Sequence, residues 1–211
     1  MTDVQKYSST DDFEAKYQRD EDPWGYRSAW YERRKYALTL ACLPRERYRL
    51  VWEPACSIGV LTGLLALRAD QVLASDASPT AIAAARASRL PAGAGQVDFS
   101  VQVLPARPAI PAAGADLIVL SEFLYYLPED DRTVVLDTAQ DLLAPGGDLV
   151  VAHWRPLPGD AHLSGDEANA WVRSRLAAAG WAALVRHDDA EFVLDVLRRP
   201  ATTGDASGPG A

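Results

Sequence analysis

Short apolar runs alternate with amphipathic runs along most of this chain, and this alternation limits the folds it can adopt. The amphipathic runs have the helical spacing of apolar residues, as residues 57–69 show. Strands that alternate with helices of about 10–15 residues form an open, mostly parallel sheet covered on both faces. We therefore expect an α/β fold, closed by an antiparallel strand pair over residues 183–199. The expected parallel strands are 48–55, 71–76, 97–104, 115–122 and 148–154.

The chain of 211 residues shows no internal repeat and no linker, which predicts one domain over residues 1–199. Residues 1–22 are a polar, acidic lead-in. Residues 23–44 follow as an aromatic segment with an expected helix, which has Ser28 as its N-cap and stops at Pro44.

Composition limits which partners the protein can bind and which cellular compartment it can occupy. A net charge of −8 and a pI near 4.9 disfavour a nucleic-acid partner. The two cysteines, Cys42 and Cys56, show neither a disulfide framework nor metal-ligand spacing, so we expect a reducing compartment and no metal. The N-terminus lacks a signal-peptide pattern and no apolar run is long enough for a membrane span, which predicts a cytoplasmic protein. The turn-rich tail, 200–211, is expected to be disordered.

Two acids stand at the ends of the first two expected strands, where open α/β sheets bind ligands. Glu53 precedes a turn of small residues, 55–59, and Asp76 follows 23 residues later. An acid at that spacing can accept hydrogen bonds from both ribose hydroxyls. Each feature alone has a plainer explanation, an ordinary strand-to-helix turn or a helix N-cap. Ser78 can supply the cap, however, and the pair together indicates a nucleoside.

Several segments, in their order along the chain, resemble the nodulation protein S family of S-adenosylmethionine-dependent methyltransferases, and more distantly the thiopurine methyltransferases. The resemblance covers about residues 20–155 and implies a Rossmann-like class I methyltransferase sheet. It therefore implies S-adenosylmethionine as the cofactor and S-adenosylhomocysteine as the product. The matching segments are DPWGYRSAWYERRKYALTLACLP, WEPACSIGVLT, ASDASPTAI, DLIVLSEFLYYL and LLAPGGDLVVAHWR.

The resemblance assigns cofactor contacts to residues at the strand ends. The methionyl part would lie against Glu53 and the first turn, the ribose on Asp76, and the adenine near the end of the third strand. Two positions depart from the family pattern: Val103 replaces an acid, and Ala55 replaces a glycine and is tolerable if its backbone angles are ordinary. The implied contacts on the strand ends are Glu53, Ala55, Ser57, Gly59, Asp76, Ala77, Gln102, Val103 and Ser121.

The aromatic segment before the first strand is implied to be a lid that carries Trp24 and Tyr31 over the cofactor. An arginine there can pair with the methionyl carboxylate, because a guanidinium binds a carboxylate through two hydrogen bonds. Arg34 is the favoured candidate and Arg33 its alternative. Helical spacing places Trp30 with Arg34 on one face and Tyr31 with Lys35 on another. Packing of these aromatic residues on the sheet is the competing explanation.

The residues that follow the fourth and fifth strands are the candidates for binding the methyl acceptor. Glu122 or His153 could orient an amine and take its proton, and Tyr125 could add a hydroxyl. The alternatives are a capping acid, a buried histidine and a packed tyrosine.

The predicted function is methyl transfer to a nitrogen, less readily an oxygen, of a small-molecule acceptor such as an amino sugar or secondary metabolite. The rivals are a different displacement on the same cofactor, a binding protein without activity, and a nicotinamide oxidoreductase. The oxidoreductase is disfavoured because the first turn lacks GxGxxG. The acceptor itself and the oligomeric state stay open.

Overall fold

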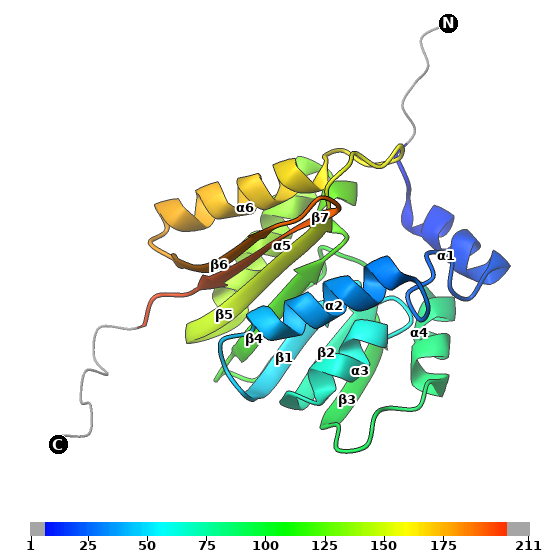
Figure 1. The fold of residues 1–211 in the computed structure, drawn as a ribbon, viewed down its shortest axis with the longest axis horizontal. Coiled ribbons are helices and arrows are strands. Elements are labelled where there is room, and N and C mark those ends of the chain that lie inside the picture. The colour runs from blue at the N-terminus through cyan, green and yellow to red at the C-terminus, as the bar shows by residue number, and fades with distance from the viewer. Residues whose placement is uncertain (1–6, 202–211) are drawn as a thin grey trace, which may run out of the picture.

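The computed structural model describes residues 7–201, which form one seven-stranded sheet with helices on both faces (Figure 1). The strand order is β3-β2-β1-β4-β5-β7-β6, and only β7 runs antiparallel to its two neighbours. This is the expected α/β fold with its antiparallel C-terminal hairpin. The strands are β1 (Tyr48–Pro54), β2 (Ala69–Asp76), β3 (Gln96–Val101), β4 (Ala115–Ser121), β5 (Leu143–Trp154), β6 (Ala182–Asp188) and β7 (Phe192–Arg198).

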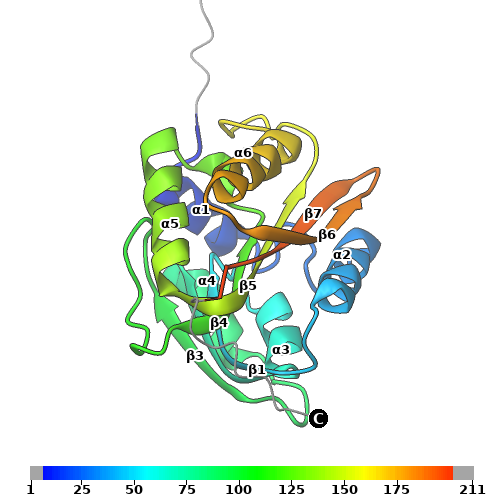
Figure 2. The ribbon, with the colours of Figure 1, turned by 90° about the vertical axis from the view of Figure 1, so that its left-hand side faces the viewer.

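The helices divide between the two faces (Figures 1 and 2). On one face α2, α3 and α4 pack on the sheet, and on the other α5 and α6 do so. A separate helix, α1, contacts α4. The helices are α1 (Thr10–Arg19), α2 (Trp30–Cys42), α3 (Val60–Ala66), α4 (Pro79–Ala87), α5 (Glu129–Leu142) and α6 (Gly165–Ala178), with a short 3-10 turn η1 (Leu124–Tyr126).

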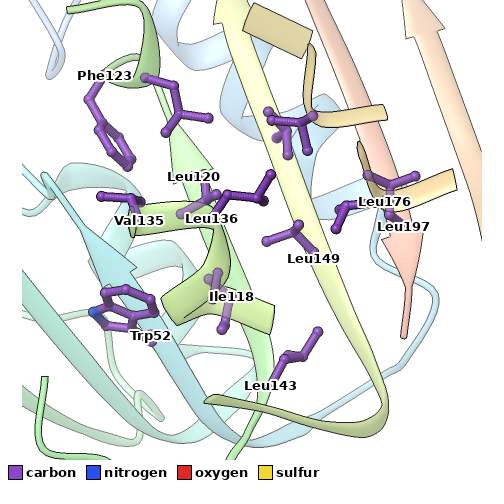
Figure 3. Packing of buried hydrophobic residues seen from close by; sticks show 14 of the residues in the cluster. Trp52, Ile118, Leu120, Phe123, Val135, Leu136, Leu143, Leu149, Leu176 and Leu197 are labelled. Carbon is purple, nitrogen blue, oxygen red and sulfur yellow. The ribbon is translucent and has the colours of Figure 1, made fainter. Parts of the chain in front are cut away.

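The central strands are apolar on both sides because both sides are covered. Along β4 the side chain of Ile118 packs toward α5 and that of Val119 toward α3, and neither is exposed. Figure 3 shows buried side chains of the α5–α6 side, among them Trp52 and Leu149 from the sheet and Leu136 from α5. This core on both faces holds the sheet rigid, and the site lies at the carboxyl ends of its strands.

The N-terminal expectations need correction. The lead-in contains α1, whose signal is a capping box: the Ser9 hydroxyl accepts the Asp12 amide and the Asp12 carboxylate accepts the Ser9 amide. Ser28 does not cap α2, since the helix begins at Trp30 and Ala29 precedes it without a side-chain hydrogen bond.

Two further local expectations have different outcomes. The helix expected over 57–69 is shortened to α3, because the preceding turn contains residues with left-handed backbone angles. Ser78 caps α4 as expected, accepting the Ala81 amide at 3.0 Å. The tail lies outside the described residues apart from Pro200 and Ala201. Within the described chain, no helix has the length and apolar content that crossing a bilayer requires.

The strand order reverses between β1 and β4, which lie side by side although β2 and β3 come between them in sequence. Open α/β sheets bind ligands in the crevice beyond the strand ends at such a switch point. A ligand site is therefore expected at the loops after β1, β2, β4 and β5.

Candidate active site

A cavity of about 570 Å³ lies at the carboxyl edge of the sheet, at this switch point. One side is made by residues after β1, β2 and β3, including Ser57, Asp76 and Gln102. Residues after β4 and β5, such as Glu122 and Trp154, make another side. Helices α1 and α2 complete the wall.

The backbone is strained where it meets the cavity. Within residues 7–201, the non-glycine residues with positive φ are Ala55 (55°), Ser57 (53°) and Glu122 (61°), and all three line the cavity. Such conformations cost about 1–3 kcal/mol each and gather at functional sites. The condition placed on Ala55, ordinary backbone angles, is not met: it adopts the left-handed conformation of the glycine it replaces.

Asp76 is held at the end of β2 by two backbone amides. Its Oδ2 accepts Ser57 N–H and its Oδ1 accepts Ser78 N–H, both at 2.9 Å. Burial raises its pKa, and the hydrogen bonds from Ser78 and Ser57 oppose that rise. A carboxylate oxygen has two lone pairs, so each oxygen can still accept a further hydrogen bond from the cavity.

Glu122, at the end of β4, is the most heavily bonded side chain in the wall. Its Oε1 accepts Lys35 Nζ at 2.5 Å and the Tyr31 hydroxyl at 3.2 Å. Its Oε2 accepts the Tyr125 hydroxyl at 2.7 Å and the Trp154 amide at 2.8 Å. Burial raises the pKa of Glu122, but the charge of Lys35 and the hydrogen bonds from Lys35 and the Trp154 amide together hold the net pKa below the ordinary value.

Lys35 joins two carboxylates behind this wall. Its side chain is 1% exposed, and Nζ lies 2.9 Å from Glu32 Oε2 as well as against Glu122. Burial lowers the pKa of Lys35, yet the charges of Glu122 and Glu32 raise it above the usual value overall. The ammonium group therefore stays charged, and one face of α2 forms an ionic cluster with the end of β4.

Helix α1 is fastened over the cavity at several points. Glu14 accepts hydrogen bonds from Ser78 and Thr80 at the start of α4. The Tyr17 hydroxyl donates to Ser57 Oγ at 2.5 Å. Lys16 pairs with Asp160 of the β5–α6 loop at 2.9 Å. These contacts join α1 to both sides of the cavity.

The charged side chains in the lining are mostly acidic. Lys16 is the cation among the described lining residues, and it is already paired with Asp160. The carboxylates are Glu32, Asp76, Glu122 and Asp160. Aromatic rings, including Trp24, Tyr26 and Tyr126, provide much of the remaining surface.

Comparison with known proteins assigns the family. A methyltransferase from Pseudomonas syringae with a known crystal structure is 39% identical, and the match covers 81% of this chain and 100% of that one with a TM-score of 0.65. A methyltransferase-domain family model matches residues 51–147. The chain belongs to the class I S-adenosylmethionine-dependent methyltransferases.

Two other relatives extend this comparison. The N-methyltransferase NodS of Bradyrhizobium japonicum, solved with S-adenosylhomocysteine, has a TM-score of 0.72 over 92% of this chain and 100% of that one. At 22% identity this likeness concerns the fold. A ubiquinone biosynthesis O-methyltransferase of Xylella fastidiosa (strain 9a5c) is 34% identical over 102 residues, 48% of this chain. That match spans 40% of the relative's length, well under half.

The cofactor of this methyltransferase class is S-adenosylmethionine, and the residues at the strand ends fit it. Asp76 keeps lone pairs free toward the cavity. Glu53 is 3% exposed just before the strained turn, and its Oε2 has no hydrogen-bond partner. Burial raises the pKa of Glu53 to about 8. A buried carboxyl oxygen without a partner costs free energy, and a hydrogen bond from a bound group would relieve that cost.

The methyltransferase cavity brings together ten of the residues predicted as site residues. They come from α2 and its preceding loop, from the three strand ends on the cofactor side, and from the loop after β4. They are Trp24, Tyr31, Ala55, Ser57, Asp76, Ala77, Gln102, Ser121, Glu122 and Tyr125.

Arg34 lies outside the cavity. Its guanidinium pairs with Asp189 in the β6–β7 turn, and this contact lowers the pKa of Asp189. Arg33, the alternative, bonds to the carbonyl of Ser28 and lies over the Trp30 ring. Neither arginine therefore faces the cavity, because the side of α2 that turns inward carries Tyr31 and Lys35.

His153 is also outside the cavity, as a fully buried residue of β5. Its Nδ1 lies 2.7 Å from Asn169 Oδ1, and its Nε2 accepts the Leu124 amide at 3.3 Å. Burial lowers its pKa, so the ring is neutral with both nitrogens engaged. This geometry corresponds to the buried-histidine alternative rather than to a base beside an acceptor.

Three further residues predicted to bind the cofactor do not line the cavity: Glu53, Gly59 and Val103. Glu53 is buried before the turn, Gly59 is the N-cap of α3 with a φ of 76°, and Val103 is half exposed. Residues 7–201 contain no group of three or more His, Cys, Asp or Glu side chains that could hold a metal ion.

Sequence reasoning missed three residues that the structure brings to the site. Lys35 shares a helical face with Tyr31, and that spacing was the available signal. Lys16 and Tyr17 belong to α1, and the capping box at Ser9 would have revealed their helix. Their partners across the cavity have no local signature, because the contacts join residues far apart in the chain.

Proposed function

We propose that this methyltransferase transfers the methyl group of S-adenosylmethionine to a nitrogen of a small-molecule amine. The observation that carries this proposal is the charge at the cavity: four carboxylates in the lining face two ammonium groups, Lys16 in the lining and Lys35 behind the wall, so an acidic excess remains. Such a cavity favours a cationic cofactor and an amine acceptor, and it disfavours a phosphorylated or carboxylated acceptor. The aromatic rings supply apolar contact for the rest of the acceptor.

The cofactor half of the cavity is proposed to use the ends of β1, β2 and β3. Asp76 would accept the ribose hydroxyls on its free lone pairs, and the strained turn at Ala55 and Ser57 would bring backbone groups close to the methionyl part. Gln102 would lie along the adenine edge, and Ser121 would offer its carbonyl to the methionyl ammonium group. The cavity lining supports this arrangement because all five residues face it.

The cofactor supplies a methyl group on a sulfonium sulfur and is released as S-adenosylhomocysteine. The protein's task is to bind the acceptor nitrogen in line with that methyl group and to exclude water. An amine that enters neutral becomes an ammonium ion on methylation, so no proton need leave during the transfer. The lowered pKa of Glu122 makes it a weak base, which supports holding the acceptor over deprotonating it. The general-base role stays a prediction.

The test uses the purified protein, S-adenosylmethionine and matched panels of small amines and alcohols. Release of S-adenosylhomocysteine, together with a methyl-group gain in acceptor mass, is expected with amines and not with the matched alcohols. Methylation of alcohols alone would move the acceptor atom to oxygen. A mass gain other than methyl would support the alternative displacement. Absence of both S-adenosylmethionine binding and product would overturn the proposal.

A further inference from the structure

The acceptor half of the cavity contains two tyrosine hydroxyls that share one carboxylate. Tyr31 comes from α2 and Tyr125 from η1, and their hydroxyls donate to different oxygens of Glu122, at 3.2 and 2.7 Å. Both tyrosines line the cavity. Burial, together with the charge of Glu122, raises the pKa of each phenol, so both keep their protons.

A tyrosine hydroxyl that has donated its proton can only accept further hydrogen bonds. Glu122 accepts both protons here, so each phenol oxygen presents lone pairs to the cavity and no donor. A group that enters between them must bring hydrogens of its own. A neutral primary amine brings two N–H groups and keeps its lone pair for the methyl group. A neutral secondary amine brings one N–H group, and an alcohol brings a single O–H.

Lys35 holds this arrangement in place. It neutralises Glu122 from behind the wall at 2.5 Å and is itself fixed by Glu32 at 2.9 Å. The Trp154 amide also donates to Oε2 of Glu122, and these contacts together hold the residue in its strained conformation, with a φ of 61°. Without the ammonium group, a buried carboxylate would lose its charge partner, and its two tyrosine contacts would no longer be fixed.

We propose that Tyr31 and Tyr125 form a paired acceptor site for the N–H groups of a primary or secondary amine, with Lys35 as the positioning residue that acts through Glu122. This inference rests on the proposed function, because it places the acceptor nitrogen beside the methyl group. The sheet order supports that placement. The cofactor side occupies the ends of β1 and β2, whereas Glu122 and Tyr125 follow the adjacent β4.

The test compares two cofactor analogues by calorimetric titration of the full chain. Sinefungin carries an amine where S-adenosylmethionine carries its methyl group, and S-adenosylhomocysteine has nothing there. The wild-type protein should bind sinefungin at least about tenfold more tightly than S-adenosylhomocysteine, because charge-assisted hydrogen bonds are strong. In the Tyr31→Phe/Tyr125→Phe double variant, this preference should fall to within about threefold.

Lys35→Met should lower the same preference, and Lys35→Arg should restore most of it because the charge is retained. Tyr48→Phe is the matched control: it also removes a buried tyrosine–carboxylate hydrogen bond, to Asp148 at 3.1 Å, but outside the cavity. Its analogue preference should equal that of the wild type. Failure of the wild type to bind S-adenosylhomocysteine would overturn the proposed function. Normal S-adenosylhomocysteine binding with a preference that is absent, or unaffected by the double variant, would overturn the paired-acceptor site alone.

Discussion

Asp76 is the proposed acceptor for the ribose hydroxyls. Its two oxygens are oriented by the amides of Ser57 and Ser78, so in this proposal an entering ribose meets a fixed acceptor. Asp76→Ala removes two charge-assisted hydrogen bonds, each worth about 1.5–3 kcal/mol. We expect S-adenosylhomocysteine affinity to fall by on the order of 100-fold in calorimetric titration.

Arg34→Ala is the control for that measurement, because Arg34 pairs with Asp189 away from the cavity. Its S-adenosylhomocysteine affinity should stay within about twofold of wild type, as expected for a partly exposed ion pair outside the site. If Asp76→Ala binds S-adenosylhomocysteine as tightly as the wild type, Asp76 does not bind the ribose. If Arg34→Ala binds it much more weakly, Arg34 does contact the cofactor.

Ala55 offers a test of backbone strain. A left-handed alanine costs roughly 1–2 kcal/mol, and glycine avoids this cost but loses more entropy on folding. We expect Ala55→Gly to raise the free energy of unfolding by up to about 1 kcal/mol in denaturant titration. Ala81→Gly, within α4, should lower it by about 1 kcal/mol or more. Equal destabilisation by both changes would contradict the strained turn.

For helix α2, the sequence predicts which residues share a face but not which face is buried. Helical spacing correctly separates the face with Trp30 and Arg34 from the face with Tyr31 and Lys35. It does not say which face turns inward, because both contain one aromatic and one basic residue. The structure buries Lys35 at 1% exposure and leaves Trp30 at 69%. The choice depends on Glu122, 87 residues away from Lys35, and no local pattern contains that information.

The attachment of α1 gives a prediction for a whole element. Hydrogen bonds from Ser78 and Thr80 lower the pKa of Glu14 to about 2, so it is charged at the start of α4 and stabilises that helix end. Glu14→Ala should detach α1, and amide hydrogen exchange in residues 10–19 should speed up by at least about tenfold while the sheet stays protected.

Glu21→Ala serves as the comparison for α1, because Glu21 forms an exposed pair with Arg27 and such pairs contribute little. Its exchange pattern in residues 10–19 should match the wild type. Unchanged exchange in Glu14→Ala would mean that Lys16 and Tyr17 hold the helix without it.

For the whole molecule, Glu53 links stability to pH. Burial raises its pKa from 4.5 to about 8, so the folded state holds this proton more tightly than the unfolded chain. The stability that Glu53 contributes is complete below about pH 4.5 and is lost as pH rises through about 8. We expect the melting temperature of the ligand-free wild type, measured relative to Glu53→Gln, to fall steadily across this window.

The comparison with Glu53→Gln is needed because His153 acts in the opposite direction. Burial lowers the pKa of His153 below 6.5, so its contribution to stability grows as pH rises toward about 6.5 and is complete above it. Both proteins share that contribution, and their difference isolates Glu53. Parallel pH profiles would show that Glu53 is ionised in the folded state.

The fold was predictable as a whole because its strands and helices have strong local patterns and connect in chain order. The strand end at Asp76 followed from the same reasoning, whereas β4 ends at Ser121, one residue before the expected end. The acceptor wall was less predictable: His153 has an inward position in β5 that sequence cannot distinguish from a position at the rim. Its hydrogen bonds to Asn169 and Leu124 depend on how α6 and η1 pack.

The two halves of the cavity come from different stretches of the chain, and this bears on how acceptor choice can diverge. The proposed nucleoside half lies between residues 55 and 104, inside the segment that matches the methyltransferase-domain family at 51–147. Much of the other half comes from α1, α2 and the loop after β5, outside that segment. If the proposed halves are right, substitutions in these flanking stretches would alter the choice of acceptor and leave the methyl-donor site intact.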